Sequence, residues 1–435
     1  MKGQRLLAAV LMTALLLSGC TSLSLSGADI LAPPKAAGSR AEIQTMIEKD
    51  AKGAYSLIYP VSGNYRSGII LQDINSDGVE EAVALYTASD QTPRMLVSLK
   101  TDDSYTKYSS TRLRSANIST LCFADVNADG IQEIVIGYEI GSPLSAAEAY
   151  MMSDSIDSVP IAGGFTDYVV GDFDGNSAAD ILVLTPHAGE TAAKAQLMVY
   201  TDDGFAEKSA CDIDSDVRSY AGLRFDRISD ELYGAVADGR LESGDYTTQL
   251  LYYDSAAHML VNPLFLNSSY GESVRSCSVT SADINGDGII DVPLCSLSGH
   301  TKDEEPETVC HLVRWSDYDP EQMALSAILE GVLCDRLGFM LQFTPEQLSA
   351  LTARYTDDNA VTLYSLSAKG AEPVVGKELI TVKRYEKNSY DSSLTAEANL
   401  GESATYIYTY ILKEGSPFTH DAIKDSFKLL DTHTP

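Results

Sequence analysis

The chain has 435 residues, of which 62 are acidic and 31 are basic, so its formal net charge is −31. A surface this acidic repels nucleic-acid phosphates and anionic lipid headgroups, which excludes a nucleic-acid partner and electrostatic docking on a membrane. Apolar residues make up 44% of the chain, enough for a sizeable core. The composition therefore indicates a soluble body that holds cations.

The first 19 residues are predicted to be an export signal. Lys2 and Arg5 form a short basic region, and residues 6–17 form an apolar run that is shorter than the about 20 residues needed to span a bilayer. The run ends in Leu-Ser-Gly-Cys at 17–20, which resembles a bacterial lipobox. The resemblance implies that Cys20 carries lipid and anchors the exported chain to the outer face of the cytoplasmic membrane or cell envelope. An ordinary signal peptide with an incidental cysteine is the alternative.

Residues 20–40 are rich in Ser, Gly, Ala and Pro, which is typical of a flexible tether. Within the next segment, 41–66, a short helix is predicted from about Arg40 to Lys52, because Ser39 and Glu42 have the spacing of a capping box. The stretch 55–65 could then supply a strand that closes a ring of sheets by pairing with the last one.

Six further cysteines follow Cys20, and none forms a C-x-x-C pair, so neither a zinc ribbon nor a thioredoxin-type site is indicated. Three of them, Cys122, Cys277 and Cys295, lie in apolar runs and are predicted to be small buried side chains. Export would permit disulfides, but the sequence does not specify a pairing. The remaining three cysteines are Cys211, Cys310 and Cys334.

Four nine-residue segments repeat one pattern of oxygen-bearing side chains. Oxygens fall at positions 1, 3, 5 and 9, and position 6 is Gly in three copies and Ser177 in the third. Calcium takes six to eight oxygen ligands, and the carbonyl of position 7 can add one more. We therefore predict four calcium sites, and the expected ligands are Asp73, Asn75, Asp77, Val79 and Glu81; Asp125, Asn127, Asp129, Ile131 and Glu133; Asp172, Asp174, Asn176, Ala178 and Asp180; and Asp283, Asn285, Asp287, Ile289 and Asp291.

These loops do not match an EF-hand, whose loop needs a Glu at position 12. Position 12 holds an apolar residue in every copy: Ala84, Ile136, Val183 and Leu294. Short β-branched or aromatic runs flank the loops, so we expect the loops to join strands. Simple hairpin turns would explain one copy, since Asp, Asn and Gly favour turns. Four copies in register, each with an acid at position 9, favour metal binding.

The spacing of the loops predicts a β-propeller. They begin at residues 73, 125, 172 and 283, so the last gap is about two periods, and a degenerate copy at 223–230 has Ile228 where a ligand would stand. A loop plus four short strands in about 50 residues has the size of one blade.

Five blades are thus expected within 67–330. Residues 331–435 would add two more, for about seven, or form a small C-terminal α+β domain beside five or six blades. Strands are predicted there at 339–343, 360–366, 378–385 and 405–412, with a helix or a final strand at 417–430.

The nine-residue pattern, its strand flanks and its period resemble the FG-GAP/VCBS-type repeats, which include the integrin α-subunit propellers. The resemblance covers roughly 67–327, although the Phe-Gly signature of the family is not evident. It implies blades with calcium loops, but not a function, because such propellers serve adhesion, lectin-like binding, scaffolding and occasionally catalysis. Together with the lipobox and the short helix, the repeats also resemble VCBS-repeat lipoproteins of anaerobic Gram-positive bacteria.

The expected function is a cell-surface binding or adhesion module for a glycan or a protein. A structural or assembly lipoprotein of the envelope is the first alternative, and an exported glycoside hydrolase or lyase is the second. The sequence has no G-x-S-x-G, no H-E-x-x-H and no Gly-rich phosphate loop, and its six histidines are scattered. No catalytic constellation is therefore predicted. The 24 tyrosines suit recognition, although Tyr406, Tyr408 and Tyr410 fit better as alternating residues of one strand.

Overall fold

The computed structural model describes most of the chain after residue 38 and is built mainly of β-strands. Its described residues are 39–101, 104–153, 155–266, 270–297, 299, 304–369, 372–391 and 397–430. The strands pair antiparallel, which confirms the predicted all-β class. The predicted signal peptide, the lipidation site Cys20 and nearly all of the predicted tether lie outside the described residues. Within the described ranges, no helix is long and apolar enough to cross a membrane.

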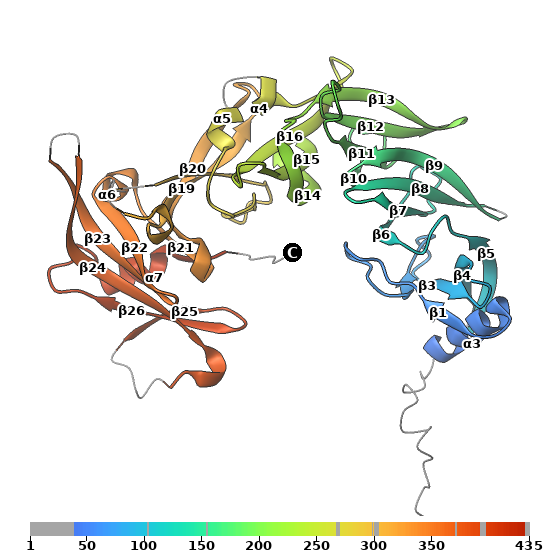
Figure 1. The fold of residues 1–435 in the computed structure, drawn as a ribbon, viewed down its shortest axis with the longest axis horizontal. Coiled ribbons are helices and arrows are strands. Elements are labelled where there is room, and N and C mark those ends of the chain that lie inside the picture. The colour runs from blue at the N-terminus through green and yellow to red at the C-terminus, as the bar shows by residue number, and fades with distance from the viewer. Residues whose placement is uncertain are drawn as a thin grey trace, which may run out of the picture.

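Six sheets follow one another along the chain and form an open arc, with the first and the sixth sheets at its two ends (Figure 1). The first sheet holds β1 (Tyr55–Leu57), β2 (Ile69–Gln72), β3 (Glu81–Ala88), β4 (Pro93–Thr101) and β5 (Ser104–Arg112). The second holds β6 (Ile118–Ala124), β7 (Glu133–Gly141), β8 (Leu144–Met152) and β9 (Ile156–Phe165). The third holds β10 (Asp167–Gly171), β11 (Asp180–Thr185), β12 (Lys194–Thr201) and β13 (Gly204–Asp212).

The fourth sheet holds β14 (Val217–Ser229), β15 (Leu232–Leu241), β16 (Tyr246–Asp254) and β17 (Met259–Val261). The short helices α4 (Pro263–Leu266) and α5 (Tyr270–Ser273) lead into the fifth sheet, which holds β18 (Val292–Leu297), β19 (His311–Asp319), β20 (Ala324–Cys334), β21 (Phe339–Gln342) and β27 (Phe427–Leu429). The sixth holds β22 (Leu351–Asp357), β23 (Ala360–Lys369), β24 (Glu372–Glu386), β25 (Ala398–Glu402) and β26 (Tyr406–Leu412). The remaining elements are the helices α6 (Pro345–Leu348) and α7 (His420–Ser426) and the 3₁₀ turns η1 (Pro306–Thr308), η2 (Asp335–Leu337) and η3 (Lys387–Ser389).

The N-terminal helix is placed as predicted and packs on the first sheet. The helix α3 (Ser39–Ala51) buries Ile43 and Ile47 against residues of β3 and β4. Asp50 near its end accepts hydrogen bonds from the Tyr86 hydroxyl and the Ser110 hydroxyl, and it pairs with the Lys107 ammonium. Burial raises the pKa of Asp50, but these hydrogen bonds outweigh burial and hold the pKa below its usual value.

The prediction that 55–65 supplies a strand to the last sheet is wrong for the described structure. β1 pairs with β3 of the first sheet instead. The pairing is local because only residues 58–80, which include β2, separate β1 from β3, whereas the sixth sheet lies at the far end of the arc (Figure 1).

The C-terminal part of the chain forms one sheet, and its last strand returns to the preceding sheet. β22 to β26 make the sixth sheet, while β27 pairs with β21 of the fifth. The segment predicted as a helix or a final strand contains both, since α7 runs directly into β27. The described residues thus make six sheets, and the predicted number of about seven blades is not confirmed.

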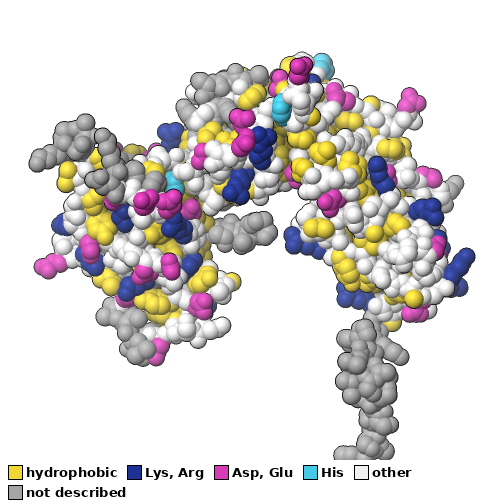
Figure 2. Space-filling view, viewed as in Figure 1, with side chains coloured by type: hydrophobic (Ala, Val, Ile, Leu, Met, Phe, Trp, Pro, Cys, Tyr) yellow, Lys and Arg dark blue, Asp and Glu magenta, His cyan; other side chains and the backbone are white. Residues whose placement is uncertain are grey.

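The surface charges are dispersed on the face that Figure 2 shows. Acidic, basic and hydrophobic side chains alternate along the whole arc in that view. The large net negative charge is therefore not gathered into one patch on this face.

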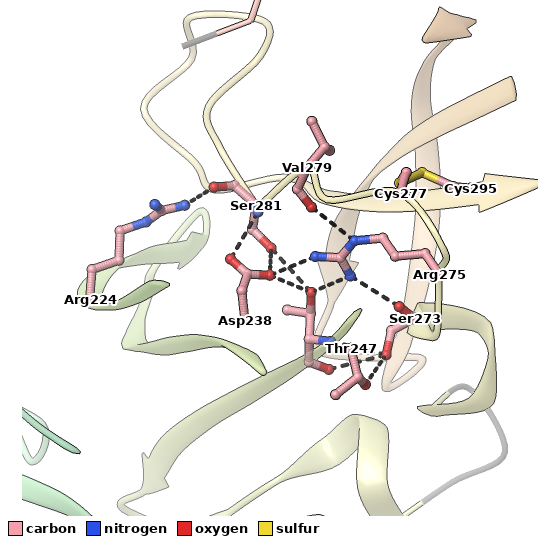
Figure 3. Close-up of polar contacts among 10 residues, drawn as sticks. Arg224, Asp238, Thr247, Ser273, Arg275, Cys277, Val279, Ser281 and Cys295 are labelled. Carbon is pink, nitrogen blue, oxygen red and sulfur yellow. Dashed lines mark hydrogen bonds and ion pairs between the residues drawn. A yellow bond between two sulfur atoms is a disulfide. The ribbon is translucent and has the colours of Figure 1, made fainter. Parts of the chain in front are cut away.

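A buried polar cluster joins the fourth sheet to the segment that leads into the fifth (Figure 3). The Arg275 guanidinium, which is 1% exposed, pairs with the Asp238 carboxylate on β15, with 2.9 Å between Nη2 and Oδ1. Asp238 also accepts hydrogen bonds from the Thr248 hydroxyl and from the backbone N–H of Ser281. A buried ion pair is tolerated only when its remaining polar atoms are satisfied, and this cluster meets that condition.

A disulfide lies next to this cluster. Cys277 and Cys295 are bonded to each other, which corrects the prediction that both are simply small buried side chains. The sequence could not show this pairing, because bonding depends on two segments that meet only in the fold.

We predict that Arg275→Met lowers the free energy of unfolding by about 3–5 kcal/mol, because it leaves the buried Asp238 charge without a partner. Urea unfolding followed by circular dichroism measures the change. Arg218→Met is the matched control, because its ion pair with Glu242 is largely exposed and such pairs contribute little to stability. Equal losses in the two variants would contradict the importance of the buried cluster.

Candidate metal-binding loops

The four predicted loops lie at equivalent places in four sheets. Three of the loops connect the two strands of a hairpin: β2 and β3 in the first sheet, β6 and β7 in the second, and β10 and β11 in the third. The fourth leads into β18, and an isolated bridge between Ala282 and Asp291 closes it like a hairpin. The loops therefore join extended strands, as their flanks predict.

Each loop is held by the same set of hydrogen bonds. In the first, the Asp73 carboxylate accepts from the backbone N–H of Asp77 at 3.1 Å and of Gly78 at 2.9 Å. Asn75 Oδ1 accepts from the N–H of Asp77 at 3.0 Å, and Asp77 Oδ1 accepts from the N–H of Val79 at 2.8 Å. The equivalent bonds recur in the other three loops. The repeat is thus a repeat of geometry as well as of residues.

Two backbone positions in each loop adopt a left-handed conformation. At position 6, Gly78, Gly130 and Gly288 have φ between 80° and 87°. Ser177 takes the same place in the third loop with a φ of 72°, although a Cβ is disfavoured there. The Ser177 backbone N–H donates to Asp172 Oδ2 at 2.9 Å, which is the bond that Gly makes in the other copies. The loop's hydrogen bonds thus hold a conformation that the residue itself does not favour.

The acid at position 9 is fully buried in every loop. Its exposed fraction is 2% for Glu81, 0% for Glu133, 1% for Asp180 and 0% for Asp291. One carboxylate oxygen accepts from the backbone N–H of position 2, at 2.8 to 3.1 Å, and so ties the end of the loop to its beginning.

The second oxygen of this acid lacks a partner in two loops. Glu133 Oε1 and Asp291 Oδ1 are buried and accept no hydrogen bond. Beside Asp291 lies Asp317 on β19, whose Oδ1 is also buried without a donor. Buried carboxylate oxygens in this state favour a proton or a cation.

Burial raises the pKa of these acids. It is the largest cause of the shift to about 7 in Glu133, to about 7 in Asp180 and to about 8 in Asp291. Neighbouring carboxylates add to the shifts: Asp129 acts on Glu133, Asp174 on Asp180 and Asp317 on Asp291. The loops thus concentrate negative charge around a poorly solvated acid.

The third loop brings its carboxylates closest together. The ligand oxygens of Asp172, Asp174 and Asp180 lie within 4.8 Å of one another, the only such acidic group found in the described part of the chain. Lys208 on β13 reaches this group and pairs with Asp174, while its ammonium lies 4.7 Å from the centre of the Tyr253 ring. Sequence inspection missed Lys208, because it comes from a strand well beyond the loop and belongs to no motif.

The residues present fit a hard cation. Each loop supplies only carboxylate, amide and carbonyl oxygens, and calcium and magnesium prefer oxygen to nitrogen or sulfur. Carboxylate oxygens that accept one hydrogen bond keep further lone pairs for a metal. The chemistry therefore suits divalent metal binding at the predicted positions.

Backbone hydrogen bonds link successive loops. The N–H of Gln132 in the second loop donates to the carbonyl of Ile74 in the first at 2.8 Å. The N–H of Ala179 in the third loop donates to the Asp125 carbonyl at 2.7 Å, and that of Ile290 in the fourth donates to the Arg227 carbonyl at 2.9 Å. Arg227 belongs to the degenerate copy, which lies on β14 as a strand. This copy therefore keeps its link to the next loop without the oxygen pattern.

One Ser–His contact bears on the enzymatic alternative. Ser276 Oγ and His311 Nε2 are 2.8 Å apart, but His311 Nδ1 is buried without a hydrogen-bond partner. Among the described residues, no carboxylate therefore hydrogen-bonds to His311 Nδ1 and orients the ring, as a catalytic triad requires.

No protein-family description matches the sequence, and no curated protein is similar to it at a significant level. Among solved structures, rhamnogalacturonan lyase PL11 of Bacillus licheniformis aligns at 10% identity and a TM-score of 0.32, over 63% of this chain and 70% of the lyase. BBS1N, from its complex with ARL6DN, aligns at 10% identity and a TM-score of 0.29, over 84% of this chain and 97% of that one. Similarities this low carry no argument about fold or function.

We predict that Lys208→Met destabilises the protein in chelator and that calcium reverses the loss. The variant keeps most of the side-chain volume but removes the positive charge beside three carboxylates, at a cost on the order of 1 kcal/mol. Thermal unfolding with chelator and with calcium measures both effects. Lys194→Met in β12 of the same sheet is the control, because Lys194 is exposed and lies outside the loop. Identical calcium responses in the two variants would contradict a cation site here.

Proposed function

We propose that this protein is an exported lipoprotein whose body is a calcium-stabilised binding or adhesion module for a glycan or a protein at the cell surface. The observation that carries the proposal is the recurrence of one oxygen-rich loop geometry in four sheets. Each copy ends in a fully buried acid, and in two copies, at Glu133 and Asp291, one oxygen of this acid accepts no hydrogen bond.

Calcium is the proposed ion because of the number and kind of ligands and because its coordination geometry is flexible. Positions 1, 3, 5 and 9 give side-chain oxygens and position 7 a carbonyl, which leaves room for water in a six- to eight-fold shell. Magnesium demands a near-ideal octahedron and is bound less often by a set supplied entirely by the protein. A divalent ion would relieve the repulsion among the loop carboxylates and lower the raised pKa values at position 9.

We further propose that the sheets are blades of the FG-GAP/VCBS type in a propeller of about seven. Support comes from the second and third sheets, each a four-stranded meander that begins with a loop hairpin. The backbone bonds between successive loops also favour a radial repeat over separate domains. The described residues supply six of these sheets.

Recognition of a glycan or a protein fits the surface better than a catalytic role does. Tyr59 and Tyr233 are 60% and 53% exposed, so their rings are available to a partner. Tyr408 and Tyr410 are buried, and they serve the core of the sixth sheet. A structural lipoprotein of the envelope would have the same exposed and buried tyrosines. It would differ in having no glycan or protein ligand that binds reversibly.

A glycan array and a pull-down with residues 41–435 separate these possibilities. We expect a defined set of glycans or a captured surface protein to bind in calcium and to be lost in chelator. A fixed envelope partner without glycan binding would favour the assembly role, and release of a sugar product would favour the hydrolase or lyase.

Chelation is predicted to destabilise the fold. With free calcium of about 1 mM and a Kd of about 0.1 mM, linkage gives roughly 1.4 kcal/mol per site, or about 6 kcal/mol for four independent sites. Chelator should therefore lower the melting temperature by about 10 °C. An unmoved melting curve, together with no calcium binding by calorimetry, would mean that the loops are only turns.

Single substitutions should localise the effect. Asp283→Ala in the fourth loop is expected to remove about one quarter of the calcium stabilisation, because it deletes a ligand of one of four sites. Asp226→Ala in the degenerate copy is the matched control and should leave the calcium response unchanged. Calcium titration followed by thermal unfolding distinguishes the two, and equal behaviour of both variants would refute the assignment of ligands.

Lipid anchoring is tested at the mature N-terminus. Mass spectrometry of the native protein should find Cys20 as the first residue, carrying acyl chains. A mature chain that starts elsewhere, or a Cys20→Ala variant that still fractionates with membranes, would contradict the proposal.

A further inference from the structure

Two cysteines outside the known disulfide face each other at one end of the fifth sheet. Cys310 directly precedes β19, and Cys334 is the last residue of β20. These strands are antiparallel with His311 opposite Leu333, so the next position outward sets Cys310 opposite Cys334.

The backbone at this position suits a cross-link. The N–H of Cys310 donates to the Ala353 carbonyl at 3.0 Å, and the Cys334 carbonyl accepts from the N–H of Gly338 at 3.0 Å. The Cys310 N–H and the Cys334 carbonyl thus each bond to a third residue and not to each other. This is the pattern of two opposed strand residues that share no backbone hydrogen bond. Opposed residues of that kind have Cα atoms about 4.5 Å apart, which lies within the range that disulfides span.

The two thiols are also in contact and sealed from solvent. Cys310 is 1% exposed and Cys334 is 0% exposed, and the Cys334 thiol shares a hydrogen bond with the Cys310 thiol. Both lie in the apolar core that joins the fifth and sixth sheets. The surroundings therefore hold the two sulfurs together.

We propose that Cys310 and Cys334 form a second disulfide in the exported protein. The two thiols lose two protons and two electrons and form one S–S bond, while a disulfide-bearing oxidant takes up the electrons and protons and leaves as two thiols. One thiolate attacks the oxidant to give a mixed disulfide, and the other cysteine then displaces the reduced group. Because both sulfurs are buried in the finished fold, the exchange takes place during folding, before this core closes.

The cross-link would brace the junction between the last two sheets. It would tie the start of β19 to the end of β20, next to the backbone bond between Cys310 and Ala353 of β22. The existing Cys277–Cys295 disulfide ties the entrance of the same sheet, so the fifth sheet would carry both cross-links. Cys122 on β6 and Cys211 on β13 belong to separate sheets and stay as thiols.

Thiol counting tests the proposal on the full chain. The protein is exported by its native leader, isolated without reductant, denatured in an alkylating reagent and analysed by peptide mass spectrometry. We expect alkyl groups on Cys122 and Cys211, and linked peptides for both the 277–295 and the 310–334 pairs. Alkylated Cys310 and Cys334 beside an intact 277–295 link would overturn the proposal, and so would either cysteine bonded to a different partner.

A melting experiment separates the cross-link from packing. The double variant Cys310→Ala/Cys334→Ala should melt on the order of 5 °C below the parent protein without reductant, given the loop that the bond closes. When both proteins are unfolded and refolded in reductant, the difference should shrink to the loss of side-chain packing alone, because the parent protein then also lacks the 310–334 bond. A difference that is unchanged by reductant would contradict the disulfide. Cys122→Ala is the control, and its difference should not respond to reductant.

Discussion

The buried acid at the end of each nine-residue loop is the constraint on which the repeating part of the structure depends. A buried carboxylate is costly unless hydrogen bonds or a positive charge compensate it. In every loop one oxygen of this acid closes the loop through the N–H of position 2, which fixes the place where the next strand begins. In Glu133 and Asp291 the other oxygen is buried and accepts no hydrogen bond. The same residue therefore closes the loop and contributes an acid to the proposed cation site.

The loops also determine how one sheet follows another. Their backbone bonds join the first loop to the second, the second to the third, and the degenerate copy to the fourth. The degenerate copy shows that this link needs only a strand in the right place, and not the oxygen pattern. Around the fourth loop, the buried Arg275–Asp238 pair and the Cys277–Cys295 disulfide add to this link, and nearer the C-terminus β27 returns to pair with β21.

Local features could be predicted from the sequence, and long-range ones could not. The loops, their flanking strands and the N-terminal helix follow from patterns within about a dozen residues, and the structure places them as expected. Lys208 beside the third loop, Asp317 beside Asp291 and the pairing of β1 depend on segments that meet only in the fold. The number of sheets is a property of the same kind, because period alone does not show whether the last residues add one sheet or two.

Anomalous diffraction from crystals grown with a calcium-mimicking lanthanide tests the central claim most directly, because it locates the ions without assuming their ligands. The account predicts four strong peaks, each among the oxygens of positions 1, 3, 5 and 9 of one loop, and none at the degenerate copy around Asp226. Peaks confined to other surface carboxylates, with the four loops empty, would contradict it.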